Sequence, residues 1–287
     1  MRTVLALFSY GGLEEPTIDA VLGELSWCST NQKNVAYHRI SGDALIERSR
    51  SRAVGKFLKT DSDVMVMIDH DMEWRPGDMY HVAEQAFEKN ALVGGLYSKR
   101  AMGRGWSSRV PIDGEVEFGK PGLVETQALA TGFMAIPRTV VEGVLEQLDI
   151  TREVWPEKFK AAVDAKDHEL ISTLQDLSIA PIADGAYRKV DFEYHDYFRC
   201  IRANSQVKDS YQFLSEDWSF AVRANHCGFK SYISTKPILI HHGNYGYTIR
   251  DGMDDRDRAV EDGKKSGPGN NPPKNQRAGR NKGKLRK

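Results

Sequence analysis

The sequence predicts an α/β fold in which a mostly parallel sheet is flanked by helices. Apolar strand-like runs alternate with amphipathic helical stretches over the first hundred residues, which is the pattern of a parallel sheet with helices on its faces. Val64–Ile68 is apolar at every position, as expected for a strand that is covered on both sides. With 40% apolar and 28% charged residues, the composition is ordinary for a globular chain of 287 residues.

Hydrophobic spacing separates helices from strands in the first hundred residues. Ile18, Val21, Leu22 and Leu25 recur at positions i, i+3, i+4 and i+7, which predicts a helix that tolerates Pro16 in its first turn. Short apolar runs that end at turn residues predict strands. The expected order is a strand at Val4–Phe8, that first helix, a helix at Asp43–Leu58, a strand at Val64–Ile68, a helix opened by Pro76 and a strand at Ala91–Leu96.

The second half of the chain is less regular. Leu129–Ile136 and Ser231–Ile240 are expected to be strands, and a helix is expected to follow Ser215 and to stop at Gly228. Gly103–Gly122 has the composition of a loop or hairpin. Pro156–Leu177 has an irregular helical pattern, and Ala180–Val207 carries many aromatic residues without a clear period, so residues 150–212 are given no role.

Net charge hides an asymmetry between the body of the chain and its end. The chain holds 40 Lys and Arg against 40 Asp and Glu, yet residues 264–287 contain nine basic residues and no acidic one. The remaining residues therefore carry 31 basic and 40 acidic side chains. The stretch from 251 onward has no hydrophobic period and cannot fill a core, so we expect residues 251–287 to form a flexible basic tail. The tail either binds a polyanion such as DNA or is a passive solubilising segment.

Several classes of protein are excluded by the sequence. No apolar run approaches the roughly 18 residues that a transmembrane helix needs. Cys28, Cys200 and Cys227 are odd in number and have no Cys-x-x-Cys spacing, which argues against a disulfide framework and against a zinc finger. The expected location is the cytoplasm, which would be the host cytoplasm for a phage-encoded chain.

Two aspartates follow the most apolar strand of the chain. Asp69 and Asp71 flank His70, and strand alternation would direct both carboxylates to one side. Ligands of open α/β sheets bind at the carboxyl ends of strands, and paired carboxylates suit a hard divalent cation that also binds phosphate oxygens. The alternative is a solvated turn, in which Asp is common.

An arginine lies on the predicted buried face of the second helix. At 100° per residue, Arg50 falls in the stripe formed by Ile46, Ala53, Val54 and Phe57. A buried guanidinium requires an anionic partner, which is either a carboxylate of the core or a ligand phosphate.

Two further groups of polar residues follow in the second half of the chain, an acidic pair after Ser215 and two histidines at 241 and 242. Ser215 is a predicted N-cap, and Glu216 and Asp217 are first-turn acids that suit the helix dipole without any further role. His241 and His242 follow an apolar strand and could be strand-end histidines without a ligand. Alternatively, a histidine at this position could complete the coordination of a metal such as Mn²⁺.

In this order, the motifs resemble those of glycosyltransferases of the GT-A (Rossmann-like) fold, close to family 2 and to compact phage and bacterial glycosyltransferases. The resemblance spans most of residues 1–247. It implies a GT-A domain at 1–250, with a nucleotide-binding half at 1–100 and a half for donor sugar and acceptor at 101–250. The matching stretches are Arg50 through Phe57-Leu58, Val64–Trp74, Gly94–Arg100, Ala130–Met134, Ser215–Phe220 and Leu239–Gly243.

The resemblance also implies roles for individual residues. Asp69, Asp71 and His241 would hold Mn²⁺ or Mg²⁺, with Asp69 also near the ribose, while Asp217 or Glu216 would be the general base. The residues implied to contact a nucleotide-sugar, a UDP-sugar in the first instance, are Ser9, Tyr10, Arg50, Asp69, His70, Thr131 and Gly132.

The implied chemistry is coherent. A nucleoside diphosphate leaves readily when a metal neutralises its charge, and a carboxylate must take the proton of the attacking hydroxyl. With one candidate base and no second nucleophile, we expect inversion. Hydroxylated phage DNA, a protein and a glycan remain open as acceptors. Two alternatives are a nucleotidyltransferase, although Ser9–Glu15 lacks the basic residue typical of that class, and a nucleic-acid-binding protein with structural acidic motifs.

Overall fold

The computed structural model describes residues 1–100, 105–110, 118–146, 164–166, 197–204, 211–243 and 245–252. Its centre is a seven-stranded sheet in which five strands run in one direction and two, β7 and β6, run against them. The mixed α/β class with a mostly parallel sheet is therefore confirmed. In order across the sheet, the strands are β2 (Asn34–Ser41), β1 (Arg2–Ser9), β3 (Val64–Asp69), β7 (Phe133–Pro137), β5 (Leu92–Gly95), β10 (Ser231–Ser234) and β6 (Leu123–Thr126).

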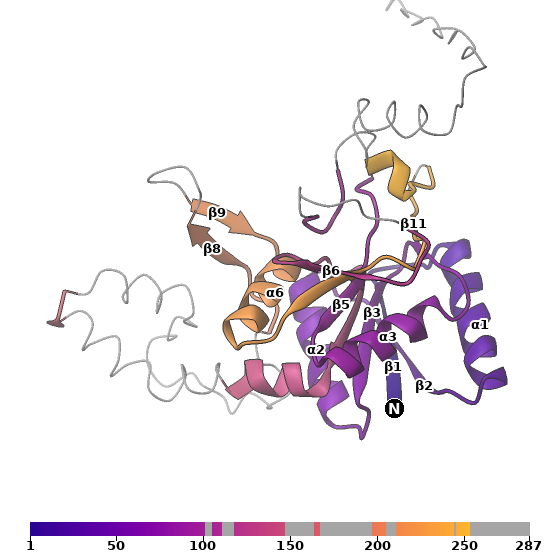
Figure 1. Cartoon of the computed structure of the whole chain (residues 1–287), viewed down its shortest axis with the longest axis horizontal. Coiled ribbons are helices and arrows are strands. Elements are labelled where there is room, and N and C mark those ends of the chain that lie inside the picture. Colours follow the sequence, from indigo (N-terminus) through magenta and orange to yellow (C-terminus); the bar gives the residue numbers. More distant parts are fainter. Residues whose placement is uncertain are drawn as a thin grey trace, which may run out of the picture.

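Helices cover both faces of this sheet (Figure 1). Alternation along β1 explains the two layers, because Val4, Ala6 and Phe8 belong to one core cluster and Leu5 and Leu7 to the other. The first cluster is closed by α2 (Ile46–Leu58), by α6 (Glu216–His226) and by a helical segment at 138–146. The second is closed by α1 (Glu15–Thr30) and α3 (Asp78–Lys89).

The predicted helices at the start of the chain and after Ser215 are confirmed, but strand β2 was missed. Its residues are largely exposed because β2 is an edge strand that pairs only with β1 within the sheet, so it has no continuous apolar run. The expected strand at Ser231–Ile240 is divided into β10 and the short β11 (Ile240–His241), which pairs with β4 (Met72–Glu73). The strand expected at Leu129–Ile136 begins only at Phe133.

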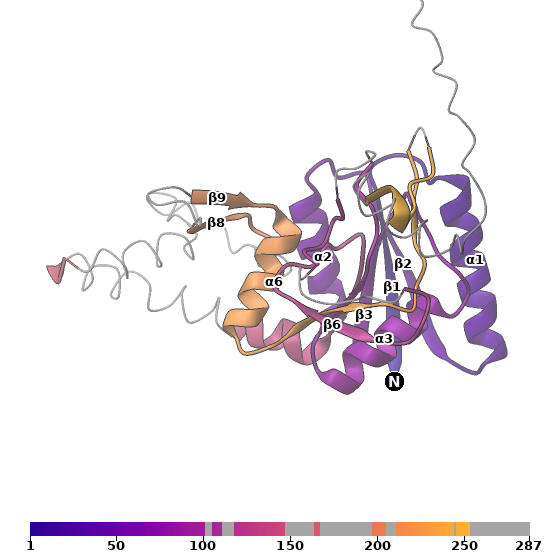
Figure 2. The same ribbon diagram turned by 45° about the horizontal axis from the view of Figure 1, so that its top comes forward.

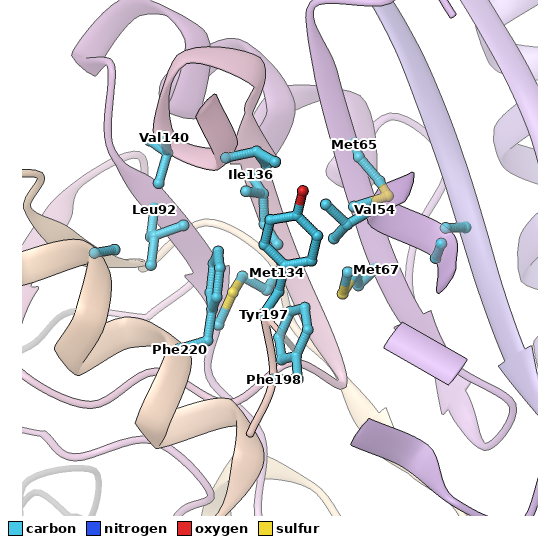
Figure 3. Close-up of a cluster of buried hydrophobic side chains, with 14 of the residues drawn as sticks. Val54, Met65, Met67, Leu92, Met134, Ile136, Val140, Tyr197, Phe198 and Phe220 are labelled. Carbon is cyan, nitrogen blue, oxygen red and sulfur yellow. The ribbon is translucent and has the colours of Figure 1, made fainter. Parts of the chain in front are cut away.

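Part of the segment with no assigned role fills the core. Tyr197 and Phe198 are fully buried, and the Tyr197 ring lies among side chains of α2, β3 and β7 (Figure 3). The rings of Phe198 and Phe220 stack with centroids 4.6 Å apart, which fixes α6 against this segment. Tyr197 and Phe198 lie in a turn rather than in a helix or strand, so no hydrophobic period marks them in the sequence.

A hairpin extends from the body next to α6. Its strands β8 (Ile201–Asn204) and β9 (Tyr211–Leu214) form a separate two-stranded sheet, and both views show it projecting away from the central sheet (Figures 1 and 2). Chain order places this hairpin directly before the acid pair at the start of α6. The last described element is a 3-10 turn, η1 (Ile249–Gly252), which includes the first two residues of the tail expected at 251–287. Asp251 is buried there, and the rest of the expected tail lies outside the described residues. Within the described part, no helix is both long and apolar enough to cross a membrane.

Candidate functional site

A pocket of about 170 Å³ lies at the carboxyl ends of β1 and β3. Parallel strands end at one edge of a sheet, so the loops after them meet there, and this is the usual ligand position in open α/β sheets. The aromatic ring of Tyr10 contributes to the wall although the residue is 69% exposed. Five of the residues expected to contact a donor or metal line the pocket, namely Ser9, Tyr10, Asp69, His70 and Asp71.

Arg50 lies at the junction of three elements. Its side chain is 4% exposed, and its Nη2 donates to both carboxylate oxygens of Asp69, at 2.9 and 3.1 Å. Its Nη1 donates to Glu216. The helical phase had placed Arg50 on a buried face that needed an anionic partner. The structure provides two carboxylates, one from the end of β3 and one from the start of α6.

The acid pair at the start of α6 divides into two environments. Glu216 is paired with Arg50. Burial raises the pKa of Glu216 above its usual range, and the positive charge of Arg50 offsets only part of that rise. Asp217 is half-buried, and its Oδ1 accepts from the backbone N–H of Trp218 at 2.7 Å and from the Ser215 hydroxyl. Ser215 is the N-cap residue, as expected, but its hydroxyl is bound to Asp217 and makes no capping hydrogen bond.

Asp71 and His241 form a second centre, beside the Arg50 network. The Asp71 side chain is 3% exposed, and its Oδ2 lies 3.6 Å from His241 Nε2. The Arg100 guanidinium contacts both side chains: Nη2 forms an ion pair with Asp71 Oδ2, and Nε donates to His241 Nε2 at 3.0 Å. His241 Nδ1 is 2.9 Å from the carbonyl oxygen of Ser98, which accepts its proton and leaves Nε2 as the acceptor. Burial and the Arg100 charge lower the pKa of His241, so its ring is neutral near pH 7.

The two predicted aspartates contact different arginines. Strand β3 ends at Asp69, and Asp71 belongs to the turn that leads to β4, so each carboxylate meets a different arginine. Both still line the same pocket. The neighbouring His242 is directed elsewhere, with Nε2 2.7 Å from a Glu73 carboxylate oxygen, which agrees with the choice of His241 as the candidate ligand.

Thr131 and Gly132 lie beneath this site. The backbone N–H of Gly132 donates to the Tyr97 hydroxyl at 3.0 Å, and its carbonyl accepts from the Asp69 N–H at 3.1 Å. A Cβ at position 132 would lie 2.3 Å from the Tyr97 oxygen and 3.2 Å from Asp69 Oδ2, so only glycine fits. Thr131 is fully buried, and its hydroxyl makes no hydrogen bond within the described residues.

The residues fit a divalent cation in part. Asp71 Oδ1 is buried without a hydrogen-bond partner, and a neutral imidazole that donates Nδ1–H to a carbonyl is the arrangement of a metal-binding histidine. Among the described residues, however, no group of three or more His, Cys, Asp or Glu side chains is arranged to hold a metal. Asp71 and His241 thus form a pair, and Asp69 is directed to Arg50.

Arg100 and Tyr97 were not among the residues predicted for the site. Both lie in the stretch after β5 that carried part of the family resemblance. A basic residue next to a Gly-Gly strand end was the available signal for Arg100. Its partners come from distant parts of the chain, so no local spacing could have identified them.

No described protein family matches the chain, and no curated protein matches it. Among solved structures, the chain is similar to A197 from STIV at 18% identity, with a TM-score of 0.46 over 85% of this chain and 86% of that one. It is also similar to GalNAc-T7 solved with UDP, GalNAc and Mn²⁺, at 10% identity and a TM-score of 0.43 over 84% of this chain. This chain spans only 43% of that structure. A glycosyltransferase involved in glycosylation of the major capsid of PBCV-1 matches at 9% identity, with a TM-score of 0.29 over 53% of this chain and 68% of that one.

Proposed function

We propose that the chain is a metal-dependent, inverting glycosyltransferase of GT-A type that transfers a sugar from a nucleotide-sugar to an acceptor hydroxyl. One observation carries the proposal. Arg50 joins Asp69, which lines the pocket, to Glu216, the neighbour of Asp217, so a donor pocket and an acid pair belong to one site. A UDP-sugar is the donor that we would test first.

The donor would occupy the pocket at the ends of β1 and β3. Ser9, Tyr10 and His70 line it, and the exposed Tyr10 ring offers a flat apolar face beside polar backbone. Thr131 and Gly132 would lie near the donor sugar. Asp71 and His241, with Asp69 close by, would hold Mn²⁺ or Mg²⁺, and a divalent cation there would neutralise the charge that develops on the leaving diphosphate.

Asp217 is the proposed general base. Its neighbour Glu216 is already paired with Arg50, whereas Asp217 Oδ1 is held by Trp218 N–H and Ser215, which orients the carboxylate. A fixed carboxylate can accept the proton of an attacking hydroxyl. One direct attack on the face opposite the diphosphate inverts the anomeric carbon.

The acceptor class is proposed from the tail. Residues 264–287 carry nine positive charges, so a polyanion such as hydroxylated DNA is the acceptor to test first, followed by a protein and a glycan. Removal of 264–287 should leave donor hydrolysis unchanged, reduce transfer to DNA and flatten its salt dependence. Equal transfer to DNA by the truncated and full-length chains at every salt concentration would exclude this role. A cytoplasmic location is part of the same proposal.

A nucleotidyltransferase is the second candidate because of one contact. The loop after β1 has no basic residue of its own, but Arg39 of β2 donates to the carbonyl oxygen of Gly11 at 3.1 Å and so supplies a guanidinium to that loop. A nucleotidyltransferase would release pyrophosphate from a nucleoside triphosphate. A glycosyltransferase would release a nucleoside diphosphate from a nucleotide-sugar.

A donor-hydrolysis screen across nucleotide-sugars with Mn²⁺, followed by candidate acceptors, tests the proposal. Asp217→Asn should retain donor binding and lower transfer by about 10²–10⁴-fold, because an amide cannot accept the proton. Glu216→Gln is the matched control, since it keeps the side-chain length and lies one residue away. If Asp217→Asn transfers normally and Glu216→Gln is inactive, the base is Glu216. If no nucleotide-sugar is consumed while pyrophosphate is released from a triphosphate, the second candidate replaces the first.

A further inference from the structure

Arg100 occupies the position between the two candidate metal ligands. Its guanidinium contacts Asp71 Oδ2 and donates to His241 Nε2, the nitrogen through which His241 would coordinate a divalent cation. The pocket that holds the donor in our proposal is lined by Arg100 as well as by Asp71. The Arg100 guanidinium therefore places an opposite charge beside the Asp71 carboxylate, which would be costly to leave without one at 3% exposure.

The aliphatic part of the Arg100 side chain packs beside Gly243, the glycine of the His241-His242-Gly243 stretch. A Cβ at position 243 would lie 3.2 Å from Arg100 Cδ. The Arg100 side chain is nevertheless 49% exposed, so its guanidinium can leave the pair toward solvent without crossing packed core. One side of the Arg100 side chain therefore packs against Gly243, and the other side faces solvent.

We propose that Arg100 is a positioning residue that holds Asp71 and His241 as a resident cation and yields that position to a divalent cation. This rests on the proposed function only in treating Asp71 and His241 as the cation site. His241 Nε2 has one lone pair, so it cannot accept a hydrogen bond from Arg100 and coordinate a metal at the same time, and the two cations would also repel each other. Metal binding and the Arg100 contact are therefore mutually exclusive.

The exchange links metal binding to nucleotide binding. Once displaced, Arg100 is an unpaired cation at the wall of the donor pocket, and a diphosphate offers it a new anionic partner. A diphosphate should then favour the metal-bound state, and the metal should favour diphosphate binding by the same factor. We expect Mn²⁺ alone to bind weakly and Mn²⁺ with UDP to bind much more tightly.

Calorimetric titration of Mn²⁺ into the full chain, with and without UDP, tests this. If the guanidinium occupies the site about nine-tenths of the time, Arg100→Met should tighten binding of Mn²⁺ alone by about 10-fold. The same variant should reduce the factor by which UDP improves Mn²⁺ binding. Arg100→Lys, which keeps the charge but cannot contact Asp71 and His241 as a fork, should tighten Mn²⁺ binding by a smaller factor.

Arg39→Met is the matched control, since Arg39 lies beside the same pocket, contacts Ser9 and Gly11, and contacts neither metal ligand. An equal gain in Mn²⁺ affinity for Arg39→Met would show a general field effect and overturn the proposal. Unchanged Mn²⁺ affinity in both Arg100 variants would also overturn it, as would absence of Mn²⁺ binding in every variant. Turnover of nucleotide-sugar by the wild-type chain decides the proposed function separately in each case.

Discussion

Glu24 and Glu216 are both shielded carboxylates, and they are satisfied in opposite ways. Glu24 of α1 is fully buried and accepts three N–H hydrogen bonds, from Trp74 Nε1 at 3.0 Å, Gly77 N at 2.8 Å and Tyr80 N at 3.1 Å, and a weaker one from the Cys28 thiol at 3.8 Å. We call Glu24, Trp74, Gly77 and Tyr80 the brace. Glu216 is instead paired with a charged side chain, Arg50, and is 18% exposed.

The two carboxylates differ in the kind of group that they contact. Backbone donors and a packed indole cannot move away from Glu24, so the brace fixes α1 to the start of α3. Gly77 adds to the rigidity, because its φ of 89° and the Trp27 ring 2.8 Å from its Cβ position both exclude a side chain. In the site, the carboxylates of Glu216 and Asp71 instead contact the charged side chains of Arg50 and Arg100. A buried carboxylate is therefore not by itself evidence of function, because Glu24 is held by a packed indole and backbone N–H groups that support the fold.

The largest loss of stability is expected in the brace. Glu24→Ala leaves three buried N–H donors without an acceptor, and each costs about 1–3 kcal/mol, so the free energy of unfolding, measured in urea, should fall by at least about 3 kcal/mol. Glu24→Gln keeps the volume and one oxygen acceptor and should lose about half as much. Nucleotide binding by the folded fraction should stay at the wild-type value. A loss below about 1 kcal/mol in Glu24→Ala would show that the brace is not structural.

The next effect concerns Arg50, where stability and binding should change together. Arg50→Lys cannot reach Asp69 and Glu216 at once, so we expect a loss of about 1–2 kcal/mol and donor affinity lowered by about 10-fold. Thermal melting and calorimetry with a nucleoside diphosphate measure the two quantities.

Arg138→Lys is the matched control for Arg50→Lys. Arg138 donates to the backbone carbonyls of Phe57, Leu58, Thr60 and Ser62 near the end of α2, far from the pocket lining. It should lose stability without any change in donor affinity. An Arg50 variant that behaves like this control would make Arg50 a structural residue only.

A smaller effect on stability is expected at Asp71. Its carboxylate is buried with Oδ1 unpaired, so Asp71→Asn removes a poorly satisfied charge together with the Arg100 contact, and the net change should stay within about 1 kcal/mol. Metal-dependent donor binding should be lost, as calorimetry with Mn²⁺ and UDP would show. Glu73→Gln, which removes the negative charge facing the adjacent His242, should retain metal-dependent donor binding. Undiminished metal-dependent binding in Asp71→Asn would exclude Asp71 as a ligand.

The smallest effect is a pH dependence on the α3 side of the molecule. Burial lowers the pKa of His81 in the folded state, nearby Lys236 lowers it further, and Glu84 and Glu88 partly oppose them. The unfolded chain therefore binds the proton first, so stability falls as the pH drops below about 6.5 and stops falling below the folded-state pKa. One such group contributes at most about 1.4 kcal/mol per pH unit. Urea unfolding from pH 5 to 8 should show a shallower slope in His81→Asn, and an unchanged slope would assign the dependence to other groups.

The sequence by itself determined the α/β class and most of the helices, because hydrophobic period depends on neighbouring residues alone. It also identified Arg50 as a buried arginine and placed Asp69 and Asp71 at a strand end, since helical phase and strand ends are local properties. It missed β2, whose exposed edge position removes the apolar run on which strand prediction depends. It also missed the core role of Tyr197 and Phe198, because irregular chain has no period.

Only the tertiary structure decided which charges meet. Arg50 was equally compatible with a carboxylate and a phosphate, and its partners Asp69 and Glu216 are 19 and 166 residues away along the chain. The contact of Arg100 with His241 spans 141 residues. Asp71, in the turn after β3, contacts Arg100, whereas Asp69 binds Arg50. Such pairings depend on how α2, α6 and the loop after β5 pack at the ends of the strands. Local sequence sets the period and phase of each element, whereas electrostatic partners across the fold are fixed only once those elements are packed together.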